Sequence, residues 1–336
     1  GAKGIGHTVL DIKPTCKKRM NLLFETESKT VPITKNMVKE AYRKVKSNQG
    51  SAGVDKESLE EFQTDLSGNL YKLWNRLASG SYFPKPVKEV EIPKSNGSKR
   101  KLGIPTVSDR IAQQVIKSYL EPRLESEFHE NSYGYRPLKS AHQAIKQIQE
   151  NVRAFGWVID MDIKSYFDEV DHELLMKAID KHVEEQWVKM YIRRWLESPV
   201  QTKDGRLVPK QGKGTPQGGV ISPLLANLYL HYVLDKWLEL KYPHIVFVRY
   251  ADDIVVHCQS ETEAKEMLQS IETRLQACHL CLNETKTQLV YCKDYRRKEK
   301  KGYRNKFDFL GFSFKPTMYR SKREAGSVFL GYGCEM

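Results

Sequence analysis

Apolar residues recur every three or four positions in several long segments, which is the pattern of amphipathic helices. One such helix is predicted to begin near Thr34, with Val38, Ala41 and Val45 on its buried face. Asp171 is expected to cap a later helix, and Asp168 suits a similar capping role. The same spacing predicts further helices over about 56–79, 108–128, 139–153, 171–197 and 261–279, and one capped by Ser222 with Pro223 at its first position.

Strand patterns follow and then alternate with these helices. Residues 87–92 alternate apolar and charged side chains, and 100–104 are the returning arm of a predicted hairpin. Nearly continuous apolar runs predict buried strands at about 157–162, 245–250 and 254–256, followed by a last strand near 307–315. Helices first, then mixed strands and helices, indicate an α+β protein.

Composition narrows the class of protein. The chain has 336 residues of which 40% are hydrophobic, so it can form a core and is not a disordered chain. A mean hydropathy of −0.59 and the absence of any apolar run near twenty residues exclude a membrane-spanning protein. The net charge of +13 favours an acidic partner, most often nucleic acid. The spacing of Cys278 and Cys281 has no second pair to complete a zinc site, so we interpret the cysteines as reduced.

Adjacent carboxylates provide the most informative chemistry. Asp252 and Asp253 stand between two apolar strands, which places both at a hairpin turn. A surface hairpin is the alternative, but the flanking runs are typical of buried strands, where acids need a balancing charge. Asp162 also ends a strand, so three carboxylates are expected to converge and hold two Mg²⁺ ions. Asp160 shares a strand face with Asp162, and the pattern alone leaves that choice open.

Ordered sequence blocks carry a resemblance to a known family. Residues 162–168 (Asp-Ile-Lys-Ser-Tyr-Phe-Asp), the glycine-rich block 215–227 and the Tyr-Ala-Asp-Asp of 250–253 resemble, in order, the palm motifs of reverse transcriptases. They are most similar to the proteins encoded by bacterial group II introns. Further similar blocks lie at 100–106, 133–142, 283–287 and 309–312, so the resemblance covers about residues 36–315.

The resemblance implies roles for individual residues. Asp162, Asp252 and Asp253 are the expected catalytic acids, which favours Asp162 over Asp160. Together with Ile163 they are the expected ligands of two Mg²⁺ ions, with Mn²⁺ as a substitute. The remaining implied roles are a steric gate against ribonucleotides at Phe167, triphosphate binding by Lys94 and Arg100, a nucleotide pocket lined by Gln217 and Gly218, and a general acid at Lys286.

The resemblance also implies a right-hand polymerase fold, with fingers, and a palm built on an antiparallel sheet with packed helices. The expected divisions are an N-terminal extension (1–35), fingers (36–156), a palm (157–323) whose loop near 197–212 packs with the fingers, and the truncated start of a thumb or linker (324–336). Apolar surface left by an absent thumb would favour self-association, so a homodimer is a hypothesis.

The expected function is RNA-directed DNA synthesis by a group II intron protein in the bacterial cytoplasm, with a maturase role in splicing. The expected partners are intron RNA, an RNA template with a DNA primer, dNTPs and, for the full-length protein, target DNA. The alternatives are a retron or CRISPR-associated reverse transcriptase, or an RNA-binding splicing cofactor alone. Basic segments predicted to contact RNA are Lys17 to Arg19 and a loop that contains Arg296, Arg297, Lys300 and Lys301, for which a solvated loop is the alternative.

Overall fold

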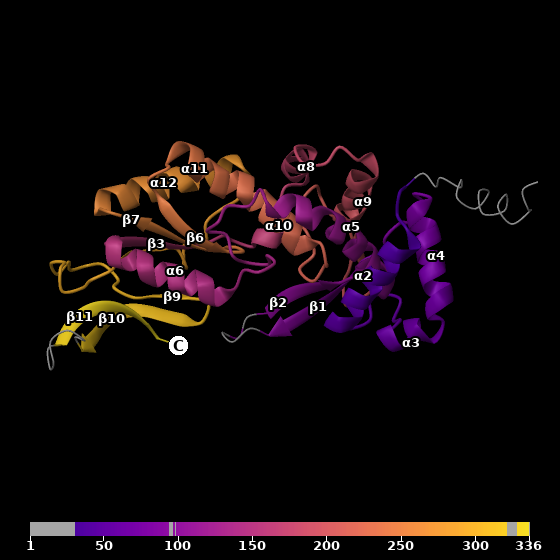
Figure 1. The fold of residues 1–336 in the computed structure, drawn as a ribbon, viewed down its shortest axis with the longest axis horizontal. Helices are drawn as coiled ribbons and strands as arrows, with labels where there is room; N and C mark the ends of the chain where they lie inside the picture. The colour runs from indigo at the N-terminus through magenta and orange to yellow at the C-terminus, as the bar shows by residue number, and fades with distance from the viewer. Residues whose placement is uncertain (1–30, 94–96, 98, 321–327, 336) are drawn as a thin grey trace, which may run out of the picture.

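The computed structural model describes residues 31–93, 97, 99–320 and 328–335, and forms an elongated molecule (Figure 1). Helices dominate one end, and two of the three sheets lie toward the other. The helices are α2 (Lys35–Asn48), α3 (Leu59–Thr64), α4 (Leu66–Ala78), α5 (Val107–Glu125), α6 (Ala141–Ala154), α7 (Tyr166–Glu169), α8 (His172–Asp180), α9 (Gln186–Glu197), α10 (Ser222–Leu230), the π-helix η1 (His231–Asp235), α11 (Lys236–Lys241) and α12 (Glu261–Ala277).

Two predicted long helices are each divided in the structure. The segment 56–79 breaks at Asp65, whose side chain accepts a hydrogen bond from Gly68 and so caps α4. The segment 171–197 breaks between α8 and α9, although the buried Ile179 and Val183 keep helical spacing across the break. Apolar periodicity was therefore a correct guide to the buried faces and a wrong guide to helix continuity.

The predicted caps have mixed outcomes. Asp171 caps α8 as predicted, because its Oδ1 accepts a hydrogen bond of 2.9 Å from the Leu174 amide. The prediction for Ser222 is wrong: it is the first residue of α10, and its hydroxyl is instead bonded to Thr215 at 2.8 Å. The prediction for Asp168 is also wrong, since it lies inside α7 after Ser165.

The strands form three sheets, with orders β6-β7-β3-β8, β2-β1-β4-β5 and β11-β10-β9. They are β1 (Val87–Pro93), β2 (Lys99–Ile104), β3 (Trp157–Asp162), β4 (Val200–Gln201), β5 (Leu207–Val208), β6 (Val246–Tyr250), β7 (Asp253–Cys258), β8 (Gln288–Tyr291), β9 (Phe307–Phe309), β10 (Phe312–Arg320) and β11 (Val328–Glu335). None of the described helices is long and apolar enough to cross a bilayer.

The sheet β6-β7-β3-β8 separates two hydrophobic cores. All of its strand pairs are antiparallel, as predicted. Helix α6 packs on one face and α12 on the other (Figure 1). Side chains alternate along β3, so Ile159 and Met161 join the core on the α12 face, and Val158 joins the core on the α6 face. Asp160 and Asp162 share the face of Val158, because they lie two and four residues after it.

Two further sheets flank this one, one of four strands and one of three. Strand β4 pairs in parallel with β1 at Val87 and Val200, so the segment after α9 contacts the predicted fingers segment. The periodicity did not predict β11, which pairs with β10 from Ser313–Glu335 to Arg320–Val328. Residues 328–335, expected to begin a thumb or linker, thus form a strand beside α6. The domain divisions themselves stay predictions.

Candidate active site

The hairpin of β6 and β7 carries two of the predicted acids. Tyr250 pairs with Asp253, so Ala251 and Asp252 form the turn between the strands. Ala251 has a φ of 57°, in the left-handed region. Gly134 lies against this turn so closely that a Cβ added there would be 2.4 Å from the Ala251 nitrogen. Backbone packing thus holds the turn in place.

The third predicted acid lies directly across the sheet from this hairpin. Asp162 at the end of β3 is the cross-strand partner of Asp253 at the start of β7. Directly paired side chains lie on the same face of a sheet with Cβ atoms about 4.5–5.5 Å apart. Asp162, Asp252 and Asp253 line one cavity of about 700 Å³. The structure therefore brings the three carboxylates to a single opening.

Burial and mutual repulsion act on these carboxylates. Burial, with the neighbouring charges of Asp252 and Asp162, raises the pKa of Asp253 to about 6. Burial and then the charge of Asp162 raise the pKa of Asp252. Burial also raises the pKa of Asp160 to about 6, but its carboxylate accepts a hydrogen bond of 2.8 Å from Gln288 and is not part of the cavity wall. The contact with Gln288 and the position of the cavity thus separate two acids that periodicity left equivalent.

Asp162 is held by residues from a loop before β8. Its Oδ2 accepts hydrogen bonds from Lys286 Nζ and Asn283 Nδ2, both at 3.0 Å, and its carbonyl accepts one from the Asn283 amide. Within the described ranges, no three His, Cys, Asp or Glu side chains are grouped closely enough to hold a metal ion. The predicted ligand set shares a cavity, to which Ile163 also contributes, but is not assembled as a metal centre.

The predicted nucleotide-binding residues divide into two groups. Arg100, on β2, donates a hydrogen bond of 2.6 Å to Gln217, and both line the cavity with the acids. Phe167 lines it as well and is only 7% exposed. Gly218 lies elsewhere: a Cβ there would be 2.5 Å from the Gly103 carbonyl oxygen, so this glycine permits close packing against β2. Lys94 lies outside the described residues.

Sequence reasoning assigned no role to two tyrosines in the cavity wall. Tyr135 and Tyr250 both line the cavity, with ring centroids 6.4 Å apart. Tyr135 has a φ of 55° and is 49% exposed, and its pKa is raised by burial and then by the charge of Asp252. Tyr135 belongs to the block 133–142, so its sequence signal was present, but only its position in space shows that it faces the acids.

A buried polar network contacts the backbone of the turn that carries Asp252. The Arg249 guanidinium pairs with Asp235 at 2.5 and 2.8 Å, and both side chains are fully buried. It also donates hydrogen bonds to Asn227 Oδ1 at 3.0 Å and to the Ala251 carbonyl at 3.1 Å. Asn227 in turn donates to the Gly134 carbonyl at 2.6 Å. No sequence pattern indicated this network.

Most cations of the basic loop after β8 have partners within the protein, and their contact with RNA stays a prediction. Arg296 and Arg297 donate hydrogen bonds to carbonyls at the end of α6, and both contact the buried Asp294. Lys300 pairs with Glu261 at 3.0 Å. Only Lys301 of the four predicted RNA contacts has no hydrogen bond or ion pair within the described part of the chain. The prediction for the Lys17 to Arg19 segment falls outside the described residues.

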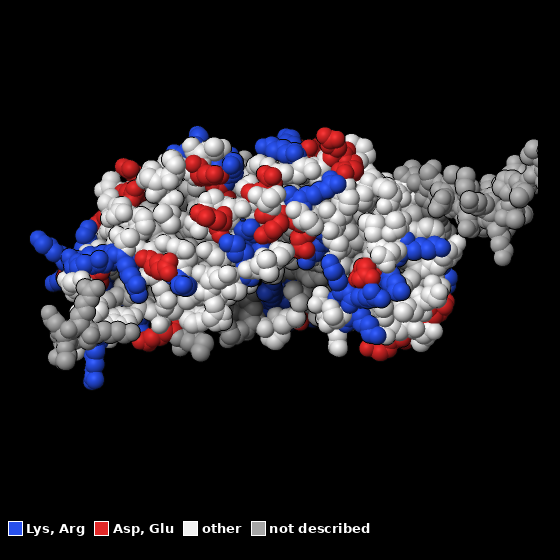
Figure 2. Space-filling view, in the orientation of Figure 1, with Lys and Arg blue, Asp and Glu red and all other residues white. Residues whose placement is uncertain are grey.

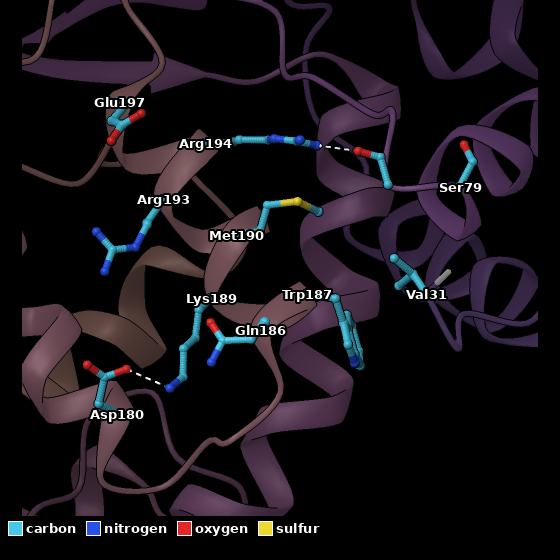
Figure 3. A pocket seen from close by; sticks show the side chains of 11 residues that line it. Val31, Ser79, Asp180, Gln186, Trp187, Lys189, Met190, Arg193, Arg194 and Glu197 are labelled. Carbon is cyan, nitrogen blue, oxygen red and sulfur yellow. Dashed lines mark hydrogen bonds and ion pairs between the residues drawn. The ribbon is translucent and has the colours of Figure 1, made fainter. Parts of the chain in front are cut away.

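Another cavity lies away from the acids, between α9 and the end of α4 (Figure 3). Its volume is about 1010 Å³. Arg194 spans it to donate a hydrogen bond to the Gly80 carbonyl, and Lys189 pairs with Asp180 at 2.7 Å. Trp187 and Met190 complete an apolar wall. Among the described residues only two carboxylates line this cavity, Asp180 and Glu197, and Asp180 is paired with Lys189, so it has less potential for catalysis than the acidic one.

Comparisons with known proteins identify the class and then the family. The fold is that of the reverse transcriptase type of polymerase: a telomerase from Candida albicans, solved with a fragment of telomeric RNA, aligns with a TM-score of 0.52 at 14% identity, over 76% of this chain and 48% of that one. At this identity the likeness concerns the fold alone. Residues 92–314 match the family model described as reverse transcriptase (RNA-dependent DNA polymerase).

Curated relatives agree with the family model. Protein YkfC of Escherichia coli is 34% identical over 76% of this chain and 77% of its own length. The group II intron-encoded protein LtrA of Lactococcus lactis is 36% identical over 60% of this chain. The chain therefore belongs to the reverse transcriptase family, and its group II intron relatives confirm the predicted type. It aligns with only 33% of LtrA, so the activities of such a whole protein are proposals here.

Proposed function

We propose that this chain extends the 3′-end of a DNA primer on an RNA template, with Asp162, Asp252 and Asp253 as its catalytic acids. The observation that carries the proposal is the single cavity in which the three carboxylates face Arg100 and Lys286. Such a cavity combines acids for the reacting centre with cations for a triphosphate, which is the charge distribution that nucleotidyl transfer requires.

The residues present fit the divalent cations on which the family generally depends. Two carboxylates have their pKa raised by burial and by like charges, and a cation would relieve both effects. Asp162, Asp252 and Asp253 would hold the ions, with Ile163 beside them, once Asp162 is released from Lys286. Two Mg²⁺ ions, when bound, supply Lewis-acid activation of the primer hydroxyl and neutralise charge on the leaving pyrophosphate; we expect Mn²⁺ to substitute.

The other cavity residues are assigned by their chemistry. Arg100 binds triphosphate oxygens through its guanidinium, and its hydrogen bond to Gln217 orients it. The buried ring of Phe167 excludes a 2′-hydroxyl and so selects dNTPs. Lys286 donates a proton to the departing pyrophosphate. These roles share one requirement, namely that the bound nucleotide lies between β2 and the acidic hairpin.

A second function follows from the intron relatives. We infer that the chain also binds intron RNA and supports its splicing, a role that needs basic surface but no aspartates. The charge of +13 favours this partner. Target DNA belongs to the same proposal for a longer protein, and self-association stays a hypothesis that light scattering at high concentration tests. A retron or CRISPR-associated enzyme is the alternative, which the flanking genomic sequence distinguishes.

Two neighbouring aspartates allow a matched test of the proposed site. Asp160 and Asp162 share one face of β3, but only Asp162 lines the cavity. We expect Asp162→Asn and Asp252→Asn to abolish primer extension with dNTPs and Mg²⁺ on an annealed RNA template, and Asp160→Asn to retain it. Loss of extension in all three variants, or in none, would contradict the assignment. Splicing support that survives Asp252→Asn would separate the two functions.

A further inference from the structure

The hairpin of β10 and β11 carries an exposed aromatic surface far from the acidic cavity. Tyr319 and Phe329 are direct partners across the two strands, with their rings stacked at 5.9 Å. Tyr319 is 40% exposed and Phe329 is 39% exposed, although both are large hydrophobic residues. Tyr295, from the loop after β8, meets Phe329 edge-on at 5.6 Å and is 64% exposed. We call Tyr295, Tyr319 and Phe329 the aromatic platform.

Backbone contacts hold the rings of this platform in place. The Tyr295 amide donates a hydrogen bond of 2.8 Å to the Leu330 carbonyl, which fixes the loop to β11. The Tyr319 ring lies over two glycines: a Cβ on Gly331 would be 2.7 Å from its Cδ2, and one on Gly333 would be 2.1 Å from its hydroxyl. Glycine at both positions therefore lets the ring lie flat on the strand.

Guanidinium groups border the platform. A pocket of about 260 Å³ is lined by the three rings together with Arg153 and Arg296. Arg296 lies 5.7 Å from the Tyr295 ring centroid and keeps 48% of its side chain exposed while it pairs with Asp294. Arg153 is exposed and has no hydrogen bond or ion pair from its side chain among the described residues. Figure 2 shows Lys and Arg side chains grouped at this end of the molecule.

We propose that the aromatic platform is a second binding site for single-stranded RNA, separate from the template site at the acids. Stacked rings bind bases without selecting sequence, and nearby guanidinium groups bind phosphates. Arg153, unpaired within the described part of the chain, and the partly exposed Arg296 beside the rings favour a phosphate-bearing partner over a protein, because charged residues are depleted in protein interfaces. The inference rests on the proposed function, since it assumes that RNA is the partner of this chain.

The position of the platform distinguishes it from the polymerase site. Leu310 lines the acidic cavity, whereas Tyr319 lies at the other end of β10 from Phe312. Seven residues of strand extend about 23 Å. RNA bound at the platform would therefore be a segment that lies outside the primer–template duplex, such as a distant part of a folded intron RNA.

The test measures anisotropy of a labelled single-stranded RNA while excess unlabelled primer–template occupies the acidic cavity. We expect Tyr295→Ala and Phe329→Ala each to weaken RNA binding at least about 5-fold, the lower end for one lost base stack. Tyr295→Phe should retain affinity, because the ring is kept. Arg153→Gln should reduce the salt slope by about 0.7, the value for one phosphate on a single strand.

Controls separate this proposal from the proposed function. Tyr71→Ala removes a tyrosine that is 53% exposed on α4, at the opposite end of the molecule (Figure 1), and should not change affinity. Primer extension on a short primer–template should stay within about twofold in every platform variant. Unchanged RNA affinity in Tyr295→Ala and Phe329→Ala, with extension intact, would overturn the platform and leave the polymerase standing. Loss of self-association with unchanged RNA binding would reassign the surface to a protein partner.

Discussion

Arg249 and Asp235 form an ion pair in which both side chains are fully buried, directly beneath the turn that carries Asp252. The pair matters for the site because Arg249 also donates a hydrogen bond to the Ala251 carbonyl, next to Asp252 in the chain. Asp235 reaches Arg249 from the π-helix η1, a type of element that is frequent at functional sites. The network therefore couples the packing of η1 to the position of an acid in the cavity.

The first prediction concerns two effects of the Arg249–Asp235 pair, one on the stability of the fold and one on the position of Asp252. Asp235→Asn leaves a buried guanidinium without its charge partner, so the free energy of unfolding should fall by about 3–5 kcal/mol in urea denaturation. The double variant Asp235→Leu/Arg249→Met should recover most of that stability, because both charges are removed together. It still lacks a donor for the Ala251 carbonyl, and we expect kcat to stay reduced by up to about 100-fold. Full activity in the double variant would show that the pair only stabilises the fold.

Local pattern predicted the acidic hairpin, whereas the features that complete the site depend on contacts between distant segments. Asp252 and Asp253 lie at the turn between two apolar strands, so the apolar pattern of the strands and the turn preference of aspartate were enough to predict their position. The pairing of Arg249 with Asp235 requires a π-helix that no apolar spacing indicates. Periodicity left Asp160 and Asp162 equivalent; the family resemblance favoured Asp162, and the structure adds the hydrogen bond from Gln288 to Asp160.

The basic loop shows a second limit of sequence patterns. Counting charges predicted an RNA contact at Arg296 and Arg297, which stays a prediction, but it did not predict that both guanidinium groups also donate hydrogen bonds to carbonyls at the end of α6. Helix ends leave such carbonyls without partners, and a cation from a distant loop meets that need. A charge count cannot tell a cation that faces solvent from one that completes a helix.

Sugar selection at Phe167 is the second prediction. Replacing the ring by a smaller side chain opens space where a ribose 2′-hydroxyl would lie, so Phe167→Val should lower the ratio of kcat/KM for dNTPs over rNTPs by at least about tenfold. The matched control is Tyr166→Phe, which keeps a ring at the adjacent position and removes only a hydrogen bond to the Ala226 carbonyl. Steady-state kinetics with both nucleotide classes measure the ratio. An unchanged ratio in Phe167→Val would remove this ring from the gate.

The contact between Lys286 and Asp162 leads to the third prediction. If the ammonium group delivers a proton to pyrophosphate, Lys286→Gln should lower kcat by about 10²–10⁴-fold with a much smaller effect on KM. Lys164→Gln removes another lysine of the same cavity and should have little effect on kcat. The solvent deuterium isotope effect on the single-turnover rate provides the second readout, because loss of the proton donor should diminish it. Equal losses in the two variants would indicate a general charge effect instead.

His257 supports the last prediction, on the pH dependence of stability. It lies on β7 with its side chain buried, and neither ring nitrogen has a hydrogen-bond partner among the described residues. Burial lowers the pKa of His257 to about 3, from an ordinary value of 6.5. Between these two values the unfolded chain binds a proton that the folded chain does not, so stability is lost as the pH falls below about 6.5.

A variant isolates this contribution from the acids of the cavity. Asp253, whose pKa is raised to about 6, acts in the opposite sense, because the folded state holds its proton more tightly and stability is lost as the pH rises. Comparing the wild-type chain with His257→Leu cancels that effect. From pH 6.5 to 5 the wild type should lose about 2 kcal/mol of unfolding free energy relative to the variant, at 1.36 kcal/mol per unit. Urea denaturation at several pH values measures the difference. If unfolding free energy depends on pH in the same way in the two proteins, the His257 ring takes up a proton within the folded structure and the prediction is wrong.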